Sequence, residues 1–305
     1  MPKDQPKMRW FDIYAPLQGF QWRGDEFEIA PGLLLNHFDK KPDLRDLDST
    51  LGKDEQEKLS RASHWLTFSW SDGSDLLPAE VVNLVLFALW LVRPSKTYVA
   101  YRFQLGQGEM ATNKCRDRLL DRFHWVQGST DDWFENSDLL KVSFFYKGAR
   151  SICCARGRLN NALLLTLAGC WSIEWLVALI CHAAAAETIL TYDTGHGITR
   201  RLAMSYACLV EEQSVKRDVE YNKFHTLYSK RSDIVHGRTH QIPKSDRLNT
   251  LVDFENVNRK LWRIVLSMPN MIANLEGLDE ERRKYFLKVQ DGYSSPLTPN
   301  QAPPT

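Results

Sequence analysis

The sequence predicts an α+β N-terminal domain followed by an all-α, up-and-down helical bundle. Strand-like alternation and helix signals are mixed before residue 150, whereas after it only helical periodicities with short connections remain. The length of 305 residues, with 43% apolar and 25% charged residues, suits a globular protein of two domains. We therefore place the α+β domain at 1–150, the bundle at 151–290, and a proline-rich disordered tail at 291–305.

The first 150 residues combine short strands with two helices. Proline suits the first turn of a helix, so Pro78 begins a helix that runs to about Val92 and stops before Pro94. A second, charged helix is expected from Asp54. Strands are predicted between Trp10 and Leu35, over 64–70 and over 97–105, while 113–125 and 133–145 stay unassigned. Seven of the ten tryptophans lie here, and they either fill the core or form a stacking platform for a planar ligand.

Five helices are predicted after residue 150, over 156–170, 172–192, 198–213, 217–236 and 245–268. Ser245 is the expected N-cap of the last helix. The apolar stripe of the second predicted helix would contain Ile173, Leu176, Ile180 and Ala183, and would lead to Glu187. The apolar run 162–190 is long enough to span a bilayer, but its charged residues and a break near Trp171 favour bundle helices and no membrane.

Composition limits the classes of site. The net charge of +1 gives no global basic field, so any nucleic-acid site must be a local patch. None of the six cysteines forms a C-x-x-C pair or a zinc spacing, so no metal and no cofactor is expected. The thiols at 170, 181 and 208 are expected to be reduced core groups, and the first seven residues lack the apolar core of a signal peptide. Both features indicate a cytoplasmic protein.

An arginine and a histidine stand at the end of the fourth predicted helix. Tyr221, Phe224, Leu227, Tyr228 and Val235 recur at three- and four-residue steps, which predicts one buried helix face. Arg231 falls on the same face, where a guanidinium is costly unless it is paired or faces a polar cleft. His236 follows five residues later, and Gly237 offers a left-handed cap that ends the helix.

This string resembles the HEPN superfamily, and in particular its Apea-like branch. The resemblance covers about residues 155–275 and includes the R-x4-H spacing, Tyr228 and Ser232 before the histidine, the acidic Glu187 in the run 185–190, and the run 201–207. It implies a HEPN-like bundle and, for catalytic members, a metal-independent ribonuclease in which each subunit of a homodimer gives one Arg/His pair to a shared cleft. Arg238 stands where some HEPN toxins have a tyrosine that is nucleotidylated, so that control is not implied.

The residue types fit this chemistry. RNA carries its own nucleophile, the 2′-hydroxyl, so cleavage needs a base, an acid and positive charge near the phosphoryl oxygens. A histidine such as His236 can be base or acid near neutral pH, and Arg231 can hold two phosphate oxygens in a fixed fork. We expect Arg231 and His236 to be catalytic, supported by Glu187, Ser232 and Tyr228. An RNA-binding rim is expected from the basic residues of 228–247, namely Lys230, Arg238, Lys244 and Arg247.

Three other interpretations stay open at this point. Arg231 could only neutralise Glu187 and hold two helices in register, and His236 could only cap a helix end. The bundle could also be a non-catalytic dimerisation scaffold that binds nucleotide or protein. By family analogy, the leading hypothesis is a defence or stress effector, with a regulatory protein or ligand acting at the N-terminal domain.

Overall fold

The computed structural model describes residues 9–37, 53–94, 97–106, 114–118, 133–192, 197–239 and 242–291. The chain divides into two units, Met1–Cys154 and Ala155–Thr305. The predicted disordered tail falls, from residue 292 onward, outside the described residues. An antiparallel sheet with helices occupies unit 1, and the described residues of unit 2 form helices joined by short connections, with no strand.

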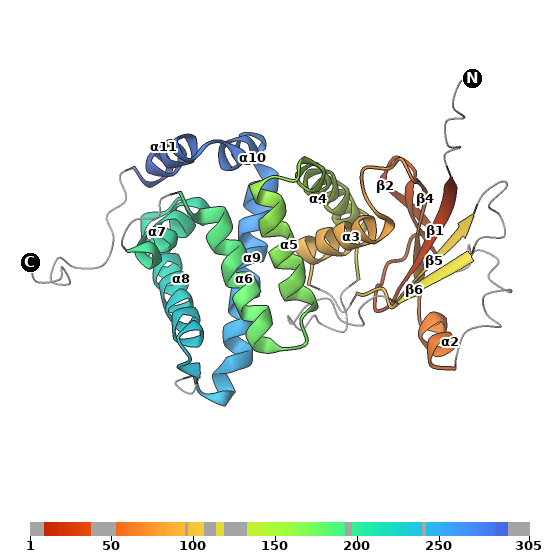
Figure 1. The fold of residues 1–305 in the computed structure, drawn as a ribbon, viewed down its shortest axis with the longest axis horizontal. Helices are drawn as coiled ribbons and strands as arrows, with labels where there is room; N and C mark the ends of the chain where they lie inside the picture. The colour runs from red at the N-terminus through yellow and green to blue at the C-terminus, as the bar shows by residue number, and fades with distance from the viewer. Residues whose placement is uncertain are drawn as a thin grey trace, which may run out of the picture. The chain divides into compact units, whose positions relative to one another are not determined.

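The sheet of unit 1 has six strands in the order β2-β3-β4-β1-β5-β6, and each neighbouring pair is antiparallel (Figure 1). The strands are β1 Trp10–Leu17, β2 Glu26–Ala30, β3 Leu33–His37, β4 His64–Ser71, β5 Tyr101–Gly106 and β6 Lys114–Arg118. β1 pairs with β4 from Trp10↔Ser71 to Leu17↔His64, and its alternate residues Ile13, Ala15 and Leu17 are fully buried. The strands predicted before residue 105 are therefore confirmed, with β5 starting later than expected.

Helix α3, Pro78–Val92, forms where the sequence predicts it. Pro78 occupies the first turn, and the Leu77 N–H donates to the Glu80 carboxylate over 2.8 Å, which satisfies one free donor of the helix start. Residues 84–91 are all buried, as expected for a helix that is apolar on every face. The shorter helix α2, Lys53–Ser60, begins one residue before the predicted Asp54.

Helix α4, Asn136–Ala155, covers most of a segment that the sequence left unassigned. Two side-chain contacts tie it to the rest of unit 1: Arg93 Nη2 lies 2.9 Å from Asp138, and the Ser143 hydroxyl donates to the Ile29 carbonyl over 2.6 Å. Tryptophans of this unit mostly support the core interpretation, since Trp22, Trp65 and Trp90 are buried. Trp10 and Trp133 are exposed, and Trp125 lies outside the described residues.

Unit 2 contains the five predicted helices followed by two more. Its helices are α5 Arg158–Trp171, α6 Trp175–Leu190, α7 Ile198–Val210, α8 Ser214–Val235, α9 Lys244–Ser267, α10 Pro269–Glu276 and α11 Asp279–Gln290. α5 packs on α6, α7 on α8, and α6 on α9, while α11 contacts α7 (Figure 1). The expectation that Ser245 caps the last long helix was wrong, because α9 starts at Lys244 directly after Pro243.

The predicted apolar stripe of α6 was wrong in part. Ala183 is buried as predicted and Leu176 is half-buried, but Ile173 precedes the helix and is 73% exposed, and Ile180 is 37% exposed. The other residues of the buried face are Ala178, Leu179, His182 and Ala186. Small alanines on this face let α5 and α9 approach closely. The predicted break in the run 162–190 is present, because α5 ends at Trp171 and Ser172 caps it. None of the described helices combines the length and apolarity that crossing a bilayer requires.

Candidate active site between α6 and α8

The buried face of α8 positions the candidate catalytic arginine. Tyr221, Phe224, Leu227 and Tyr228 are buried as predicted, and the Phe224 ring stacks with the rings of both Tyr206 and Tyr228. Val235 was expected to continue this face, but it is 51% exposed and Ile234 is buried in its place. The packed rings fix the last two turns of α8, so Arg231 projects from a rigid support.

Three side chains from two helices meet at one carboxylate oxygen. The Tyr228 hydroxyl donates to Glu187 Oε2 over 2.7 Å, and Arg231 Nη2 lies 3.3 Å from the same oxygen. The Arg231 guanidinium carbon also lies 5.3 Å from the centroid of the Tyr228 ring, within the range of a cation–π contact. The contact between Arg231 and Glu187 that one interpretation required is therefore present, and it joins α6 to α8.

The electrostatics leave part of the guanidinium unused. The side chains of Arg231 and Glu187 are 27% and 30% exposed, so water partly screens the pair. Arg231 Nε is buried without a hydrogen-bond partner, and Nη1 makes no hydrogen bond within the described residues. Burial raises the pKa of the Tyr228 hydroxyl, and Glu187 raises it further, so Tyr228 remains a protonated donor. Arg231 can therefore still accept an anion.

His236 caps the end of the same helix. The backbone N–H of His236 donates to the Ser232 carbonyl over 3.0 Å. Gly237 follows with φ of 75°, a left-handed conformation that glycine adopts without strain. The imidazole is exposed, and within the described residues no hydrogen bond or ion pair joins it to Arg231 or Glu187. The half-buried Ser232 contributes a backbone contact to this turn.

The four predicted rim cations differ in how they are held. Arg238 Nη2 lies 2.9 Å from Asp233, and Lys230 Nζ donates to the Thr250 hydroxyl over 3.1 Å. The Arg247 guanidinium carbon lies 5.4 Å from the centroid of the Trp175 ring. Lys244 is exposed at the first position of α9. Arg238 is thus partly neutralised, whereas Lys244 is accessible to an anion.

Sequence reasoning missed two supporting residues, Thr250 and Trp175. They lie on α9 and α6, far in sequence from the cations that they contact, so no spacing signal could have found them. Within the described residues no three His, Cys, Asp or Glu side chains gather in a way that could hold a metal ion. What this arrangement offers is a partly free guanidinium, a carboxylate that orients it, and an exposed imidazole at the end of the same helix.

Comparisons with protein-family models, with curated proteins and with solved structures gave no match to this chain.

Proposed function

We propose that this chain is a metal-independent endoribonuclease whose HEPN-like C-terminal domain forms a homodimer with a shared active site. One observation carries the proposal: Glu187 and Tyr228 hold Arg231 at the surface by a single oxygen and a ring, while the exposed His236 ends the same helix. A wholly structural arginine would be expected to use more of its five donors within the fold. Nε is buried, so the nitrogen that is available to a phosphate oxygen is Nη1, which has no partner within the described residues.

In the proposed reaction, one imidazole removes the proton from the 2′-hydroxyl. The O2′ atom then attacks phosphorus, and the bond from phosphorus to O5′ breaks. A second imidazole protonates the departing O5′, and the guanidinium of Arg231 neutralises the charge that builds on the non-bridging oxygens. The products are a 2′,3′-cyclic phosphate and a 5′-hydroxyl. Because one subunit supplies a single His236, the second imidazole comes from His236 of the partner subunit.

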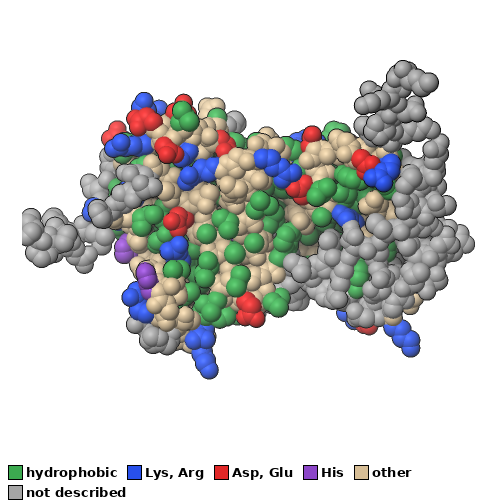
Figure 2. All heavy atoms as spheres, in the orientation of Figure 1, with side chains coloured by type: hydrophobic (Ala, Val, Ile, Leu, Met, Phe, Trp, Pro, Cys, Tyr) green, Lys and Arg blue, Asp and Glu red, His purple; other side chains and the backbone are tan. Residues whose placement is uncertain are grey.

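An uncovered apolar face beside the site supports the homodimer. Ile173, Val177 and Ile180 are 73%, 50% and 37% exposed, and Val235 at the end of α8 is 51% exposed. Ile180 and Glu187 are seven residues apart on α6, so they lie along one line of that helix. Figure 2 shows hydrophobic side chains gathered over α5 and α6 on this face. A second copy of the chain that covered these residues would bring two copies of the α6–α8 site together.

The chemistry is tested with the wild-type protein and a single-stranded RNA in EDTA. Cleavage should persist, the new ends should be a 2′,3′-cyclic phosphate or the 3′-phosphate formed from it, and an all-2′-deoxy substrate should resist. Loss of cleavage in EDTA, or cutting of the deoxy substrate, would rule out the proposed reaction.

The shared site is tested by Val177→Asp, which places a charge on the apolar face. Light scattering should show a monomer, and RNA cleavage should fall with it, since an isolated subunit lacks the second histidine. The matched control is Val215→Asp, which changes a valine that is 77% exposed in the first turn of α8. A Val177→Asp protein that stays dimeric, or that cuts RNA as a monomer, would contradict the composite site.

The second candidate is a non-catalytic HEPN-like scaffold that dimerises and binds nucleotide or protein. The observation that favours it is the Tyr228–Glu187–Arg231 contact itself, which already holds α6 against α8 without any substrate. Under this alternative, wild-type protein would dimerise but would not cut RNA under any condition above.

In a defence or stress effector, unit 1 would sense a signal, recruit a partner or restrain the ribonuclease activity of unit 2. One feature of unit 1 could accept a regulatory ligand. A depression of about 310 Å³ lies over one face of the sheet, and its polar lining includes Asp12, Tyr14, Asn36, Thr67 and Ser69. Two of its walls are fixed by hydrogen bonds, from Ser69 to Asp12 and from Asn36 to Thr67.

A further inference from the structure

A second polar site lies in unit 2, where α11 and the end of α6 meet the start of α5. A pocket of about 300 Å³ is lined there by Arg158, Arg282 and Arg283, together with Thr191 and Tyr192. We call it the arginine pocket. None of these residues belongs to the α6–α8 site, and no sequence pattern groups them.

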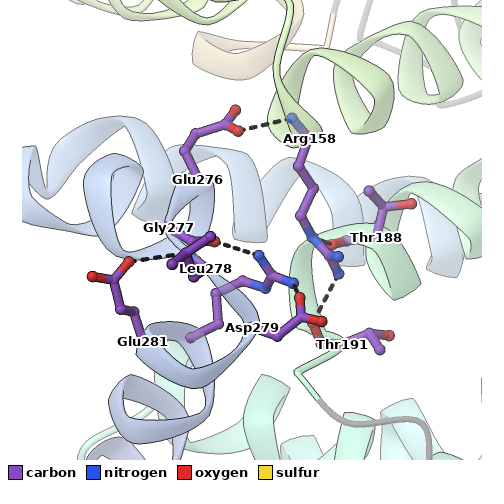
Figure 3. Close-up of polar contacts among 9 residues, drawn as sticks. Arg158, Thr188, Thr191, Glu276, Gly277, Leu278, Asp279 and Glu281 are labelled. Atoms are coloured by element: carbon purple, nitrogen blue, oxygen red, sulfur yellow. Dashed lines mark hydrogen bonds and ion pairs between the residues drawn. The ribbon is translucent and has the colours of Figure 1, made fainter.

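The charge of Arg158 meets only neutral groups through its hydrogen bonds. Its Nε donates to the Thr188 carbonyl over 2.8 Å and its Nη2 to the Thr191 carbonyl over 2.7 Å. The nearby Glu276 carboxylate accepts the backbone N–H of Arg158 over 2.7 Å (Figure 3). It also accepts the backbone N–H of Leu159 over 2.8 Å. Arg158 therefore closes the C-terminal end of α6 without a carboxylate bonded to its guanidinium.

Arg282 forms the deep wall of the pocket. Its side chain is only 10% exposed, and its terminal nitrogens donate to the Gly277 carbonyl and to Asp279. Its Nε is buried without a partner, as is the Thr191 hydroxyl. Burial of Arg158 lowers the pKa of its guanidinium, and the nearby positive charge of Arg282 lowers that pKa further. Two cations thus converge on one cavity, beside two buried donors that have no partner in the fold.

The carboxylates of the pocket do not cancel this charge. Asp279 pairs with Arg282, and Glu280 lies 3.9 Å from Lys284, which is on the same helix. Arg283 is exposed and makes no ion pair within the described residues. Asp279 and Glu276 offset part of the charge of Arg158 without a hydrogen bond to its guanidinium. The remaining charge of Arg158 and the charge of Arg283 are left for a ligand to neutralise.

The geometry points to a binding site for the phosphate group of a small phosphomonoester or of free phosphate. A guanidinium presents its N–H groups in a planar fork that matches phosphate oxygens, and three arginines line this pocket. A cavity of about 300 Å³ accepts a compact anion and excludes a folded macromolecule. The Tyr192 ring, which stacks on Phe286 at 5.1 Å between centroids, gives the pocket one rigid flat wall.

The same site offers a route of control, which rests on the proposed ribonuclease function. Arg158 holds the carbonyl of Thr188, the residue that follows Glu187 on α6. An anion that draws Arg158 away from the last turn of α6 would shift Glu187 and, through it, Arg231. Bound phosphate is therefore expected to change the rate of RNA cleavage as well as to bind.

Calorimetry on the full chain tests the binding, with inorganic phosphate and with adenosine 5′-monophosphate titrated at constant ionic strength. Wild type should show saturable binding of one or both probes at one site per chain. Tighter binding of the nucleotide would identify a phosphomonoester as the ligand, and equal binding would identify the phosphate alone. Arg283→Gln should weaken binding about tenfold or more, since it removes a charged donor.

Two further variants keep the test decisive. Lys288→Gln removes a charge of the same sign from an exposed position of α11 outside the pocket, so it should bind as wild type does. His236→Ala should also bind as wild type, which separates this proposal from the ribonuclease proposal. Absence of saturable binding in the wild type, or equal weakening by Arg283→Gln and Lys288→Gln, would overturn the arginine pocket as a phosphate site.

Discussion

His182 and Glu187 lie five residues apart on α6 and occupy opposite environments. The His182 ring is fully buried, and neither of its nitrogens has a hydrogen-bond partner. It rests against Gly169, where an added Cβ would lie 2.9 Å from the ring. Glu187 is 30% exposed and receives both Tyr228 and Arg231. The interior of the bundle thus keeps an ionisable group neutral, whereas its surface gives a charged group partners and access to water.

The largest expected effect is on the stability of the fold at low pH, and it arises from the buried His182. Burial lowers the pKa of His182 to about 3. Below pH 6.5 the unfolded chain takes up a proton there and the folded chain does not, so stability falls as the pH drops from 6.5 toward 3 and is unaffected by this group above 6.5. The loss should be about 2 kcal/mol at pH 5.

His182→Leu should remove that pH dependence. At pH 7 the variant should be as stable as wild type or more stable, because it replaces two unpaired ring nitrogens with apolar atoms. Urea unfolding followed by circular dichroism at pH 7 and pH 5 measures both effects. If wild type and variant lose equal stability between the two pH values, the buried ring does not behave as described.

A smaller effect on stability is expected from removing the hydroxyl of Tyr228, which contacts the partly exposed Glu187. Tyr228→Phe keeps the ring under Arg231 but removes the 2.7 Å hydrogen bond to Glu187. A hydrogen bond to a charged group contributes about 1.5–3 kcal/mol, and partial exposure of Glu187 places this one near the lower end. RNA cleavage should fall less than for loss of Arg231 itself, since the guanidinium remains.

Tyr206→Phe is a matched control, because it removes the hydroxyl of another buried tyrosine that stacks on Phe224. It should not change cleavage beyond its effect on stability. Equal cleavage by Tyr228→Phe and wild type would show that the Tyr228–Glu187 hydrogen bond does not orient the site.

The smallest effects are expected at the rim cations. Lys244→Ala removes an exposed cation and should reduce the slope of log affinity for RNA against log salt by about one unit or less. Arg238→Ala should change the slope less, because Asp233 already neutralises part of the Arg238 charge. Stability should change by less than about 1 kcal/mol in either variant. Fluorescence anisotropy with the inactive His236→Ala background measures the slopes, and a larger change for Arg238→Ala would refute this ranking.

Sequence patterns predicted best where a signal was local. Pro78 and Pro94 bracket α3, and alternation located β1 and β4. The spacing of Tyr228, Arg231 and His236 placed all three at the end of α8, and the pairing of Arg231 with Glu187 was one of the stated alternatives. Whether the bundle is HEPN-like stays a prediction.

The failures arose where several faces of a helix are apolar or where partners are distant. α6 carries apolar residues almost all round, so periodicity could not choose its buried face, and the packing of α5 and α9 decided it. In α4 the run 142–146 is rich in aromatic and β-branched residues, which conceals the helical period. The arginine pocket joins α5, α6 and α11, and no spacing within one helix could have predicted it.

The most direct test of the account is the rate of RNA cleavage by His236→Ala in the presence of EDTA, measured beside wild type. Loss of the general base or acid should lower the rate by a factor of about 10² or more, while circular dichroism and light scattering remain unchanged because the imidazole is exposed. The matched control is His225→Ala, which changes a histidine on the same helix that stacks on Tyr221. Cleavage at the wild-type rate by a folded, dimeric His236→Ala protein would contradict the proposed active site.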